Sequence, residues 1–371
     1  MRVAIIGTRG YPYVYSGYET FLRELVERLV KKNVKVTVYC HRNLFKEKPK
    51  NVNGVDLVYI PTIETKSLSQ LVHSFFSMTH ACLTGVDVIF VVNSANGPFG
   101  LISRLFKIPT AINVDGLEWL RPKWKGFGGK YFKWASKQAT RWYDIIINDA
   151  DEMRRIYQET FDKDSVVIAY GGNIRYSKEP ALIKEWDLKP KEYYLIVGRF
   201  IPDNNWGIMI EGFMKSNSKR KLVVVGDVPY ENDYSSNLKK LSEVDERLVF
   251  TGLVTNRNAV AELFHNAYVY MHGHEFGGTN PTMLEALSFG SAIIALDTAF
   301  NREVLSNEKY GLYFQKNESS VENLIAEIDT KSDLVTEMKS VSRNGITKKY
   351  NWDHITDQYI EVFEKLKKAF S

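Results

Sequence analysis

Cysteine is scarce in this chain: its 371 residues include only Cys40 and Cys82, both in apolar surroundings. Two isolated cysteines form neither a disulfide framework nor the paired spacing of a zinc site. We therefore expect a reducing compartment, where free thiols persist. No apolar run reaches the ~18 residues that a membrane-spanning helix requires. Met1 leads directly into a short apolar strand, so we also expect no signal peptide.

Acidic residues are the minority charge, and the imbalance is uneven along the chain. Residues 1–180 hold 26 Lys and Arg against 17 Asp and Glu, whereas residues 181–371 hold 23 against 27. The basic half favours an anionic partner. We expect no nucleic acid there, because no nucleic-acid recognition motif is present. An anionic membrane surface is the other candidate.

The length and the apolar pattern predict two α/β domains. Single hydrophobic cores stop growing at roughly 250–300 residues, and this chain is longer. Short β-like runs alternate with amphipathic helical segments, which predicts doubly wound parallel sheets. The polar stretch 178–191 contains a proline and is the predicted linker. We therefore expect domains at 1–180 and 181–350, followed by an amphipathic helix within 351–371.

The most informative segment is 272–290, with the sequence HGHEFGGTNPTMLEALSFG. It follows a β-like run and ends in a mostly apolar helical pattern. Asn280 is a good N-cap and Pro281 fits the first helical position. Gly290 is placed to end the helix. The segment therefore predicts a strand, a glycine-bearing loop and a helix in succession.

This loop and the start of its helix suit a nucleotide. A helix N-terminus favours a phosphate, and Gly277 and Gly278 let the backbone approach a ligand closely. Glu285 lies about one turn into the helix, where its carboxylate suits a pair of neutral sugar hydroxyls. The alternative is an ordinary capped helix in which Glu285 is a favourable first-turn charge.

A second glycine-bearing turn follows the predicted strand Arg2–Ile6. Gly7, Gly10 and Gly17 are spaced too widely for the dinucleotide-binding fingerprint. The second predicted strand also ends in His41 rather than in an acidic residue. The turn is therefore either a ligand-binding loop of another kind or a tight strand–helix connection.

Two further candidates follow predicted strands, where α/β proteins place their ligands. Arg199 follows the strand 193–197 and could stabilise a departing diphosphate, or it could form a surface ion pair. Asp115 and Glu118 follow the strand 110–114. They could hold substrate hydroxyls or accept the acceptor's proton. Their alternative roles are a turn aspartate and a helix-start glutamate.

Together these segments resemble the retaining, glycogen-synthase-like GT-B glycosyltransferases, and within them the bacterial rhamnosyltransferases of capsule and rhamnan synthesis. Four motifs carry the resemblance: GTRGYP at 7–12, DGLEW at 115–119, GRF at 198–200 and GGTNP at 277–281. The resemblance implies a GT-B fold, with two Rossmann-like domains facing across a cleft. It implies an acceptor domain first, a nucleotide-sugar donor domain second, and a C-terminal helix crossing back to the first domain.

The resemblance also implies roles for individual residues. Glu285 would hold the nucleotide ribose, and Arg199 would contact the diphosphate. Relatives carry a lysine five residues after this arginine, whereas this chain has Asn204 followed by Asn205, so one cation is missing. Asparagine still donates hydrogen bonds, but without a charge.

A first glutamate holds the donor sugar in such enzymes, at the position of Gly277, and Glu275 lies two residues earlier here. The remaining donor-binding candidates are loop residues: Gly10, Gly17, Gly278, Thr279 and Asn280.

The resemblance further implies a donor, an acceptor and a reaction course. A histidine usually occupies the position of Asp115 and contacts the donor sugar, often at its 6-hydroxyl. Rhamnose is a 6-deoxy sugar and does not need that contact. The implied donor is dTDP-β-L-rhamnose, and the implied acceptor is an undecaprenyl-diphosphate-linked saccharide. The retaining outcome is ascribed to front-side attack, with the leaving phosphate taking the acceptor proton. No metal or other cofactor is expected.

Two patterns suggest metal ligands, but both have simpler readings. Asp149-Ala150-Asp151 has the DxD form, yet it lies between a predicted strand and a helix, where helix capping is favoured. His272 and His274 have ligand-like spacing, but no further ligand accompanies them, and loop contacts are favoured.

The segment 121–134 interleaves cations with aromatic residues and has no acidic residue. Such a segment suits an anionic membrane surface, whereas the alternative is buried aromatics with solvated lysines. The candidate membrane contacts are Arg121, Lys123, Trp124, Lys125, Lys130 and Lys133.

The sequence therefore predicts a rhamnosyltransferase that is cytoplasmic and peripheral on the inner face of a bacterial membrane. Its partners would be a dTDP-sugar, a lipid-linked saccharide and the membrane surface. Three alternatives stay open: a transferase using another nucleotide sugar, a GT-B sugar-nucleotide 2-epimerase, and an inactive binding module.

Overall fold

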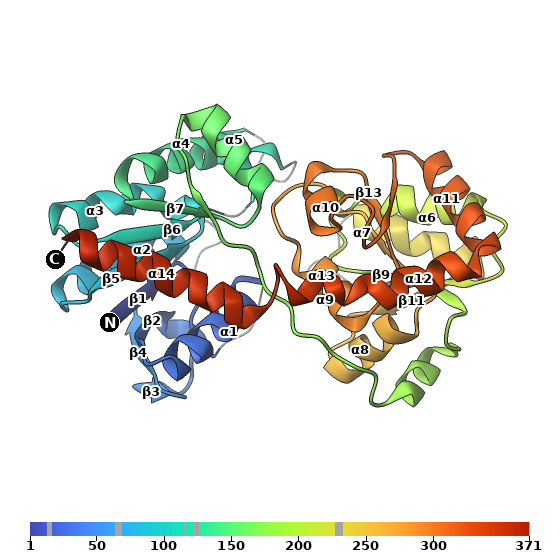
Figure 1. Cartoon of the computed structure of the whole chain (residues 1–371), viewed down its shortest axis with the longest axis horizontal. Coiled ribbons are helices and arrows are strands. Elements are labelled where there is room, and N and C mark those ends of the chain that lie inside the picture. Colours follow the sequence, from blue (N-terminus) through green and yellow to red (C-terminus); the bar gives the residue numbers. More distant parts are fainter. Residues whose placement is uncertain (13–16, 64–68, 115, 122–125, 227–232, 371) are drawn as a thin grey trace. The chain divides into compact units, whose positions relative to one another are not determined.

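The computed structural model describes residues 1–12, 17–63, 69–114, 116–121, 126–226 and 233–370. They form two compact units, each built on a sheet flanked by helices (Figure 1). The first unit comprises Met1–Tyr170 and Trp352–Ser371, and the second comprises Gly171–Asn351. The prediction of two doubly wound α/β halves is confirmed.

The first unit has an eight-stranded sheet in the order β3-β4-β2-β1-β5-β6-β7-β8. All neighbouring strands pair in parallel except β3 and β4. The central strands are apolar and buried on both faces, as a helix-covered parallel sheet requires. The strands are β1 (Arg2–Ile6), β2 (Lys35–His41), β3 (Asn51–Val52), β4 (Val55–Ile60), β5 (Val88–Val92), β6 (Thr110–Asn113), β7 (Ile145–Asn148) and β8 (Val166–Val167).

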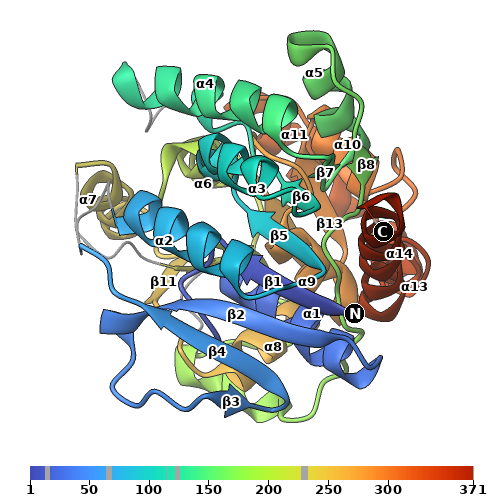
Figure 2. The same ribbon diagram turned by 90° about the vertical axis from the view of Figure 1, so that its left-hand side faces the viewer.

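Helices cover both faces of this sheet. On one face α2, α3 and α4 pack side by side, and on the other α1 packs against α14 (Figure 2). This division follows from right-handed crossovers running in opposite directions from β1. The helices are α1 (Gly17–Lys31), α2 (Ser69–Leu83), α3 (Gly100–Leu105), α4 (Phe127–Trp142), α5 (Asp151–Phe161) and α14 (Trp352–Phe370).

Helix α14 belongs to the first unit although it follows the second in sequence. Tyr359 and Phe363, one turn apart, are buried against the ring of Phe90. At the rim, the Arg28 side chain pairs with Asp353 at 3.1 Å. The amphipathic pattern of α14 is therefore matched by a specific apolar face of this unit.

The second unit has a six-stranded sheet in the order β11-β10-β9-β12-β13-β14, and every neighbouring pair is parallel. Its strands are β9 (Tyr193–Val197), β10 (Lys221–Val225), β11 (Leu248–Gly252), β12 (Val269–His272), β13 (Ile293–Leu296) and β14 (Leu312–Phe314). Its helices are α6 (Trp206–Lys215), α7 (Asp233–Lys240), α8 (Arg257–Asn266), α9 (Pro281–Phe289), α10 (Ala299–Val304), α11 (Glu318–Thr330), α12 (Ser332–Ser342) and α13 (Asn344–Thr347).

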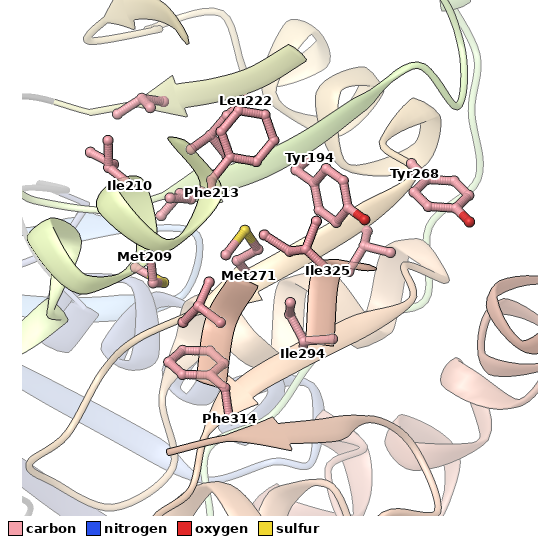
Figure 3. Packing of buried hydrophobic residues seen from close by; sticks show 14 of the residues in the cluster. Tyr194, Met209, Ile210, Phe213, Leu222, Tyr268, Met271, Ile294, Phe314 and Ile325 are labelled. Carbon is pink, nitrogen blue, oxygen red and sulfur yellow. The ribbon is translucent and has the colours of Figure 1, made fainter. Parts of the chain in front are cut away.

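The core of this unit lies between the sheet and α6, α11 and α12. Figure 3 shows Phe213 of α6 and Ile325 of α11 close to Met271 and Ile294 of the central strands. Each such side chain contributes about 1.5–3 kcal/mol when it is fully buried. This packing fixes the strand ends that carry the candidate site.

The stretch 178–191 was predicted to be the linker, but it belongs to the second unit. The buried carboxylate of Glu262 on α8 accepts hydrogen bonds from the backbone N–H groups of Lys178 and Glu179, each at 2.7 Å. A 3-10 helix follows at Pro180–Trp186. The polar composition of this stretch therefore reflects anchoring to a helix, and the chain leaves the first unit at Tyr170.

Candidate active site

The predicted donor-site segments meet at the carboxyl edge of the second sheet. Strands β9 and β12 are neighbours, and the loops after them touch. The N–H of Glu275 donates to the carbonyl of Asp203 at 3.0 Å, and the Asn205 amide donates to the carbonyl of Gly273 at 2.9 Å. The two loops therefore form one surface.

Two glycines let the backbone fold tightly at this edge. Gly198 follows β9 and Gly226 follows β10, with φ of 157° and 149°. A Cβ on Gly226 would lie 1.8 Å from the Gly198 carbonyl oxygen, so no larger residue fits there. The close approach of these turns fixes the backbone beside Arg199.

Arg199 has an anchored backbone and an exposed side chain. Its carbonyl accepts hydrogen bonds from the Asn204 amide at 2.9 Å and from the Trp206 indole N–H at 2.8 Å. The side chain itself is exposed to solvent. This arrangement fixes the backbone from which Arg199 extends its cation, at the sheet edge where α/β proteins bind ligands.

Asn204, predicted to be a donor to a diphosphate, makes two contacts within the protein. Its amide nitrogen is committed to the Arg199 carbonyl, and its oxygen lies 2.8 Å from Nδ1 of His274. In this structure Asn204 therefore links Arg199 to the second loop.

Glu275 sits in a small charged network. Its carboxylate lies 2.6 Å from Nζ of Lys316, and the Asn205 amide donates to the same oxygen at 3.3 Å. Asn205 is buried, with φ of 51°, in the left-handed region that asparagine tolerates. Sequence reasoning missed Lys316, because it follows β14, a three-residue strand that no pattern predicted.

The expected cap of α9 is confirmed. Oδ1 of Asn280 accepts from the N–H of Thr282 at 2.9 Å, Pro281 is the first helical residue, and Gly290 ends the helix with φ of 76°. In the loop before it, Gly277 has φ of 114°, which favours glycine, and Thr279 is buried. The helix N-terminus therefore follows directly from the glycine-bearing loop.

Glu285 points from the first turns of α9 with an exposed side chain. Desolvation by the surrounding protein raises its pKa, and the positive charges of Arg175 and Arg257 act against this rise. The two arginines were not predicted from sequence, since they lie far from Glu285 along the chain.

The two histidines of this loop make protein contacts. His272 is buried beside the Tyr270 hydroxyl at 2.9 Å, and burial lowers its pKa to about 3. His274 lies against Asn204. Across the residues that the structure describes, no three His, Cys, Asp or Glu side chains gather as a metal-binding group.

The glycine turn of the first unit is also tight. Gly10 has φ of 128°, and a Cβ there would lie 2.8 Å from Sγ of Cys40. The buried carboxylate of Glu19 accepts from the N–H of Arg9 at 3.0 Å, which ties the turn to α1. Gly17 is the first residue of that helix. Asp115, the other candidate of this unit, lies outside the described residues.

Glu118 and Arg121 pair with each other at 3.1 Å, and both side chains are largely covered. Arg121 is thus turned to a carboxylate and not to solvent, which differs from its predicted membrane contact. Lys130 and Lys133 are exposed on α4, whereas Lys123, Trp124 and Lys125 lie outside the described residues.

The DxD pattern straddles the start of α5. Ala150 is the N-cap residue, and Asp151 opens the helix, where a carboxylate favours the dipole. Asp149 is buried. The N-cap residue therefore has no side-chain oxygen to cap the helix. Of the predicted capping, only the first-turn charge of Asp151 is present.

Within the described ranges, no helix combines the length and apolarity needed to cross a bilayer.

Comparison with solved structures places both units in the GT-B class. Sucrose-phosphate synthase of Thermosynechococcus elongatus superimposes with a TM-score of 0.82 over 99% of both chains, at 15% identity. Anabaena HepE in complex with UDP-glucose gives 0.77 over 98% of this chain and 100% of that one, at 14% identity.

The chain belongs to the family described as "Glycosyl transferases group 1", whose model matches residues 161–347. Residues 1–173 match a domain of unknown function, DUF1972.

Two curated relatives match parts of the chain. An uncharacterized glycosyltransferase of Methanocaldococcus jannaschii is 25% identical over 64% of this chain and 62% of its own length. The alpha-monoglucosyldiacylglycerol synthase of Streptococcus pneumoniae is 29% identical over 33% of this chain and 29% of its own. The matches thus span less than two thirds of either relative.

Proposed function

We propose that this protein transfers a sugar from a nucleoside-diphosphate sugar. One observation carries the proposal: at the carboxyl edge of the second sheet, the anchored Arg199 lies beside a glycine-bearing loop that leads into a helix N-terminus. A departing diphosphate needs such fixed positive charge and N–H groups. Membership in the group 1 glycosyltransferases and the UDP-glucose complex of HepE support it.

Each part of this edge has a distinct role in the proposal. The Arg199 guanidinium stabilises the diphosphate as its bond to the sugar breaks. The loop at Gly277 and Gly278 brings backbone N–H groups to the phosphates. Glu285 accepts hydrogen bonds from the ribose hydroxyls. Glu275, oriented by Asn205 and Lys316, faces the donor sugar.

The donor is dTDP-β-L-rhamnose in this proposal. Its support is the set of four rhamnosyltransferase-like motifs and the aspartate at 115 where a 6-hydroxyl-binding histidine is usual. A thermal-shift series with dTDP, UDP, GDP and ADP tests it, because a ligand stabilises by RT ln(1 + [L]/Kd). We expect the largest shift with dTDP. A larger shift with UDP would favour a UDP-sugar, the donor class that HepE suggests. No shift with any nucleotide would contradict the transferase proposal.

The acceptor is an undecaprenyl-diphosphate-linked saccharide, and the anomeric configuration is retained. The test incubates the enzyme with dTDP-β-L-rhamnose and lipid-linked saccharides, and follows the product by mass spectrometry and NMR. We expect a β-configured donor to give a product of the same relative configuration. Inversion would contradict the proposed front-side course. Epimerised nucleotide sugar without acceptor would instead identify a 2-epimerase.

The enzyme works at the inner face of the membrane in this proposal, because its acceptor is lipid-linked. The name of the pneumococcal relative, a diacylglycerol glycoside synthase, supports a lipid acceptor. Each lysine near an anionic surface contributes about 1 kcal/mol to binding. The test variant replaces Lys123, Lys125, Lys130 and Lys133 with serine. Its control replaces the same number of lysines in the second unit: Lys184, Lys189, Lys219 and Lys348.

We expect the test variant alone to lose salt-sensitive binding to anionic vesicles and transfer to the lipid acceptor. Both variants should still bind the nucleotide. Equal sedimentation of the two variants would place the electrostatic contact elsewhere.

A further inference from the structure

Helix α2 has an unusual distribution of side chains. A surface helix normally turns apolar residues inward and charged residues outward. Residues 69–83 contain no Asp, Glu, Lys or Arg at all. The buried side includes His73, Ser74 and Ser77, whereas Phe76 is 51% and Leu83 is 70% exposed. The outward side of α2 therefore exposes Phe75, Phe76 and Leu83 beside a single exposed polar side chain, His80.

The neighbouring helix continues this apolar surface. Leu101, Leu105 and Phe106 are exposed at α3, and Leu105 reaches 75%. Helices α2 and α3 pack side by side (Figure 2), and the rings of Phe75 and Phe99 meet at 6.3 Å between them. The exposed apolar side chains of α2 and α3 thus come from two adjacent helices that are in contact.

This concentration is local. Sixteen large hydrophobic side chains are exposed in the part of the chain that the structure describes, and ten of them lie between Ile63 and Trp134. Isolated exposed apolar residues are normal, but a contiguous patch indicates a binding surface. We name the docking face by its exposed members: Phe75, Phe76, Leu83, Leu101, Leu105, Phe106, Phe127 and Trp134.

The charges on the helices of the docking face have one sign. Helices α2, α3 and α4 contain no acidic residue. Lys107 follows α3, and α4 exposes a stripe at helical spacing: Lys130, Lys133, Lys137 and Arg141. An open depression of about 580 Å³ between α4 and α5 is lined by three of these lysines. Two carboxylates on the α5 side also line it: Glu159 pairs with Arg155, and Asp162 accepts a hydrogen bond from the neutral Gln158 amide.

We propose that the docking face inserts shallowly into an anionic lipid bilayer. The apolar side chains of α2 and α3 enter the interface, and the cations of α4 meet the lipid phosphates. This inference rests on the proposed function, in which the acceptor is lipid-linked. A second copy of the chain fits less well, because a two-fold contact would bring the same cations of α4 face to face.

The first experiment measures vesicle binding of the full chain. The test variant carries Phe76→Ser, Leu105→Ser and Phe106→Ser, and keeps every charge. The control carries Val244→Ser and Leu253→Ser, which are 75% and 71% exposed on the second unit. We expect the test variant to bind anionic vesicles at least tenfold more weakly than the parent, and the control to bind within twofold. Equal binding of parent and test variant would overturn the proposal.

The second experiment reads insertion directly. An environment-sensitive fluorophore is attached at Leu105→Cys or, as control, at Leu253→Cys; the native Cys40 and Cys82 are buried. We expect a blue shift and quenching by brominated lipids only at position 105. Absence of both effects at position 105 would overturn insertion. So would a parent dimer in sedimentation that the triple variant dissolves, because the face would then join two copies.

Nucleotide binding separates this inference from the proposed function. If the parent binds dTDP but not anionic vesicles, the docking-face proposal is wrong and the donor-site proposal stands. If the parent binds vesicles but no nucleotide, the proposed function is wrong and the docking-face proposal stands.

Discussion

Removing the Glu285 carboxylate should weaken nucleotide binding without unfolding the protein. Glu285 lies on α9 with an exposed side chain, and alanine is at least as good a helix former, so Glu285→Ala should melt close to the parent. A hydrogen bond to a charged group contributes about 1.5–3 kcal/mol. Since ~1.4 kcal/mol is tenfold in an equilibrium constant, the Kd for dTDP should rise by roughly 10- to 150-fold.

This loss can be read as a melting shift. At a dTDP concentration of about 100 times the parent Kd, the ligand stabilises the parent by ~2.7 kcal/mol. A tenfold weaker variant retains ~1.4 kcal/mol under the same conditions, and a hundredfold weaker one ~0.4 kcal/mol. For a unit of this size, 1 kcal/mol corresponds to about 2–4 °C, so the difference is several degrees. Calorimetric titration should give the same ratio of dissociation constants.

The matched control is Glu337→Ala, which removes an exposed helical glutamate on α12 of the same unit. It should leave the ligand-induced shift unchanged. If Glu285→Ala keeps the full dTDP shift of the parent, Glu285 does not bind the ribose, and the reasoning from the loop and helix is wrong at this residue.

Three other outcomes are expected. Arg199→Ala should lower kcat strongly with little change in melting temperature, because its side chain is exposed; turnover within about threefold, under ~1 kcal/mol of transition-state stabilisation, would contradict its role. Transfer should survive EDTA, whereas loss with EDTA and rescue by Mg²⁺ or Mn²⁺ would return attention to Asp149 and Asp151. Burial lowers the pKa of His272 to about 3, so the unfolded ring binds a proton near pH 6.5 while the folded ring does not. Acidification from pH 7 to pH 5 should therefore lower the free energy of unfolding by about 2 kcal/mol through this ring. If His272→Asn loses as much unfolding free energy as the parent over this range in denaturant titrations, the prediction is wrong.

Local patterns predicted the elements that carry the donor site. Strand Tyr193–Val197 has the predicted bounds, because it is a continuous apolar run. The cap of α9 was also readable, since Asn280, Pro281 and Gly290 each have a backbone preference that acts within one turn. These features depend on neighbours in sequence alone.

Contacts between distant segments were not readable in the same way. The Asn204–His274 contact spans 70 residues and the Glu275–Lys316 pair spans 41, so no local sequence pattern predicts either contact. The orientation of α2 was not readable either, because its sequence has no Asp, Glu, Lys or Arg to mark the outer side. With His73 inside and Phe76 outside, the apolar residues do not identify the buried face. The linker prediction for 178–191 was wrong for a related reason, because no sequence pattern shows that Glu262 binds the backbone of this stretch.

The place of α14 has a consequence for the order in which the protein is made. The first unit draws residues 352–370 from beyond the whole of the second, and these residues cover Phe21 and Phe90. During synthesis the first unit is therefore left with an open apolar groove while the ribosome completes the next 181 residues, Gly171–Asn351. The second unit has every strand of its sheet before α14 emerges, so it can fold first. A chaperone that recognises nascent chains would find its binding site in the first unit, which leaves the tunnel before the second unit and completes its core after it.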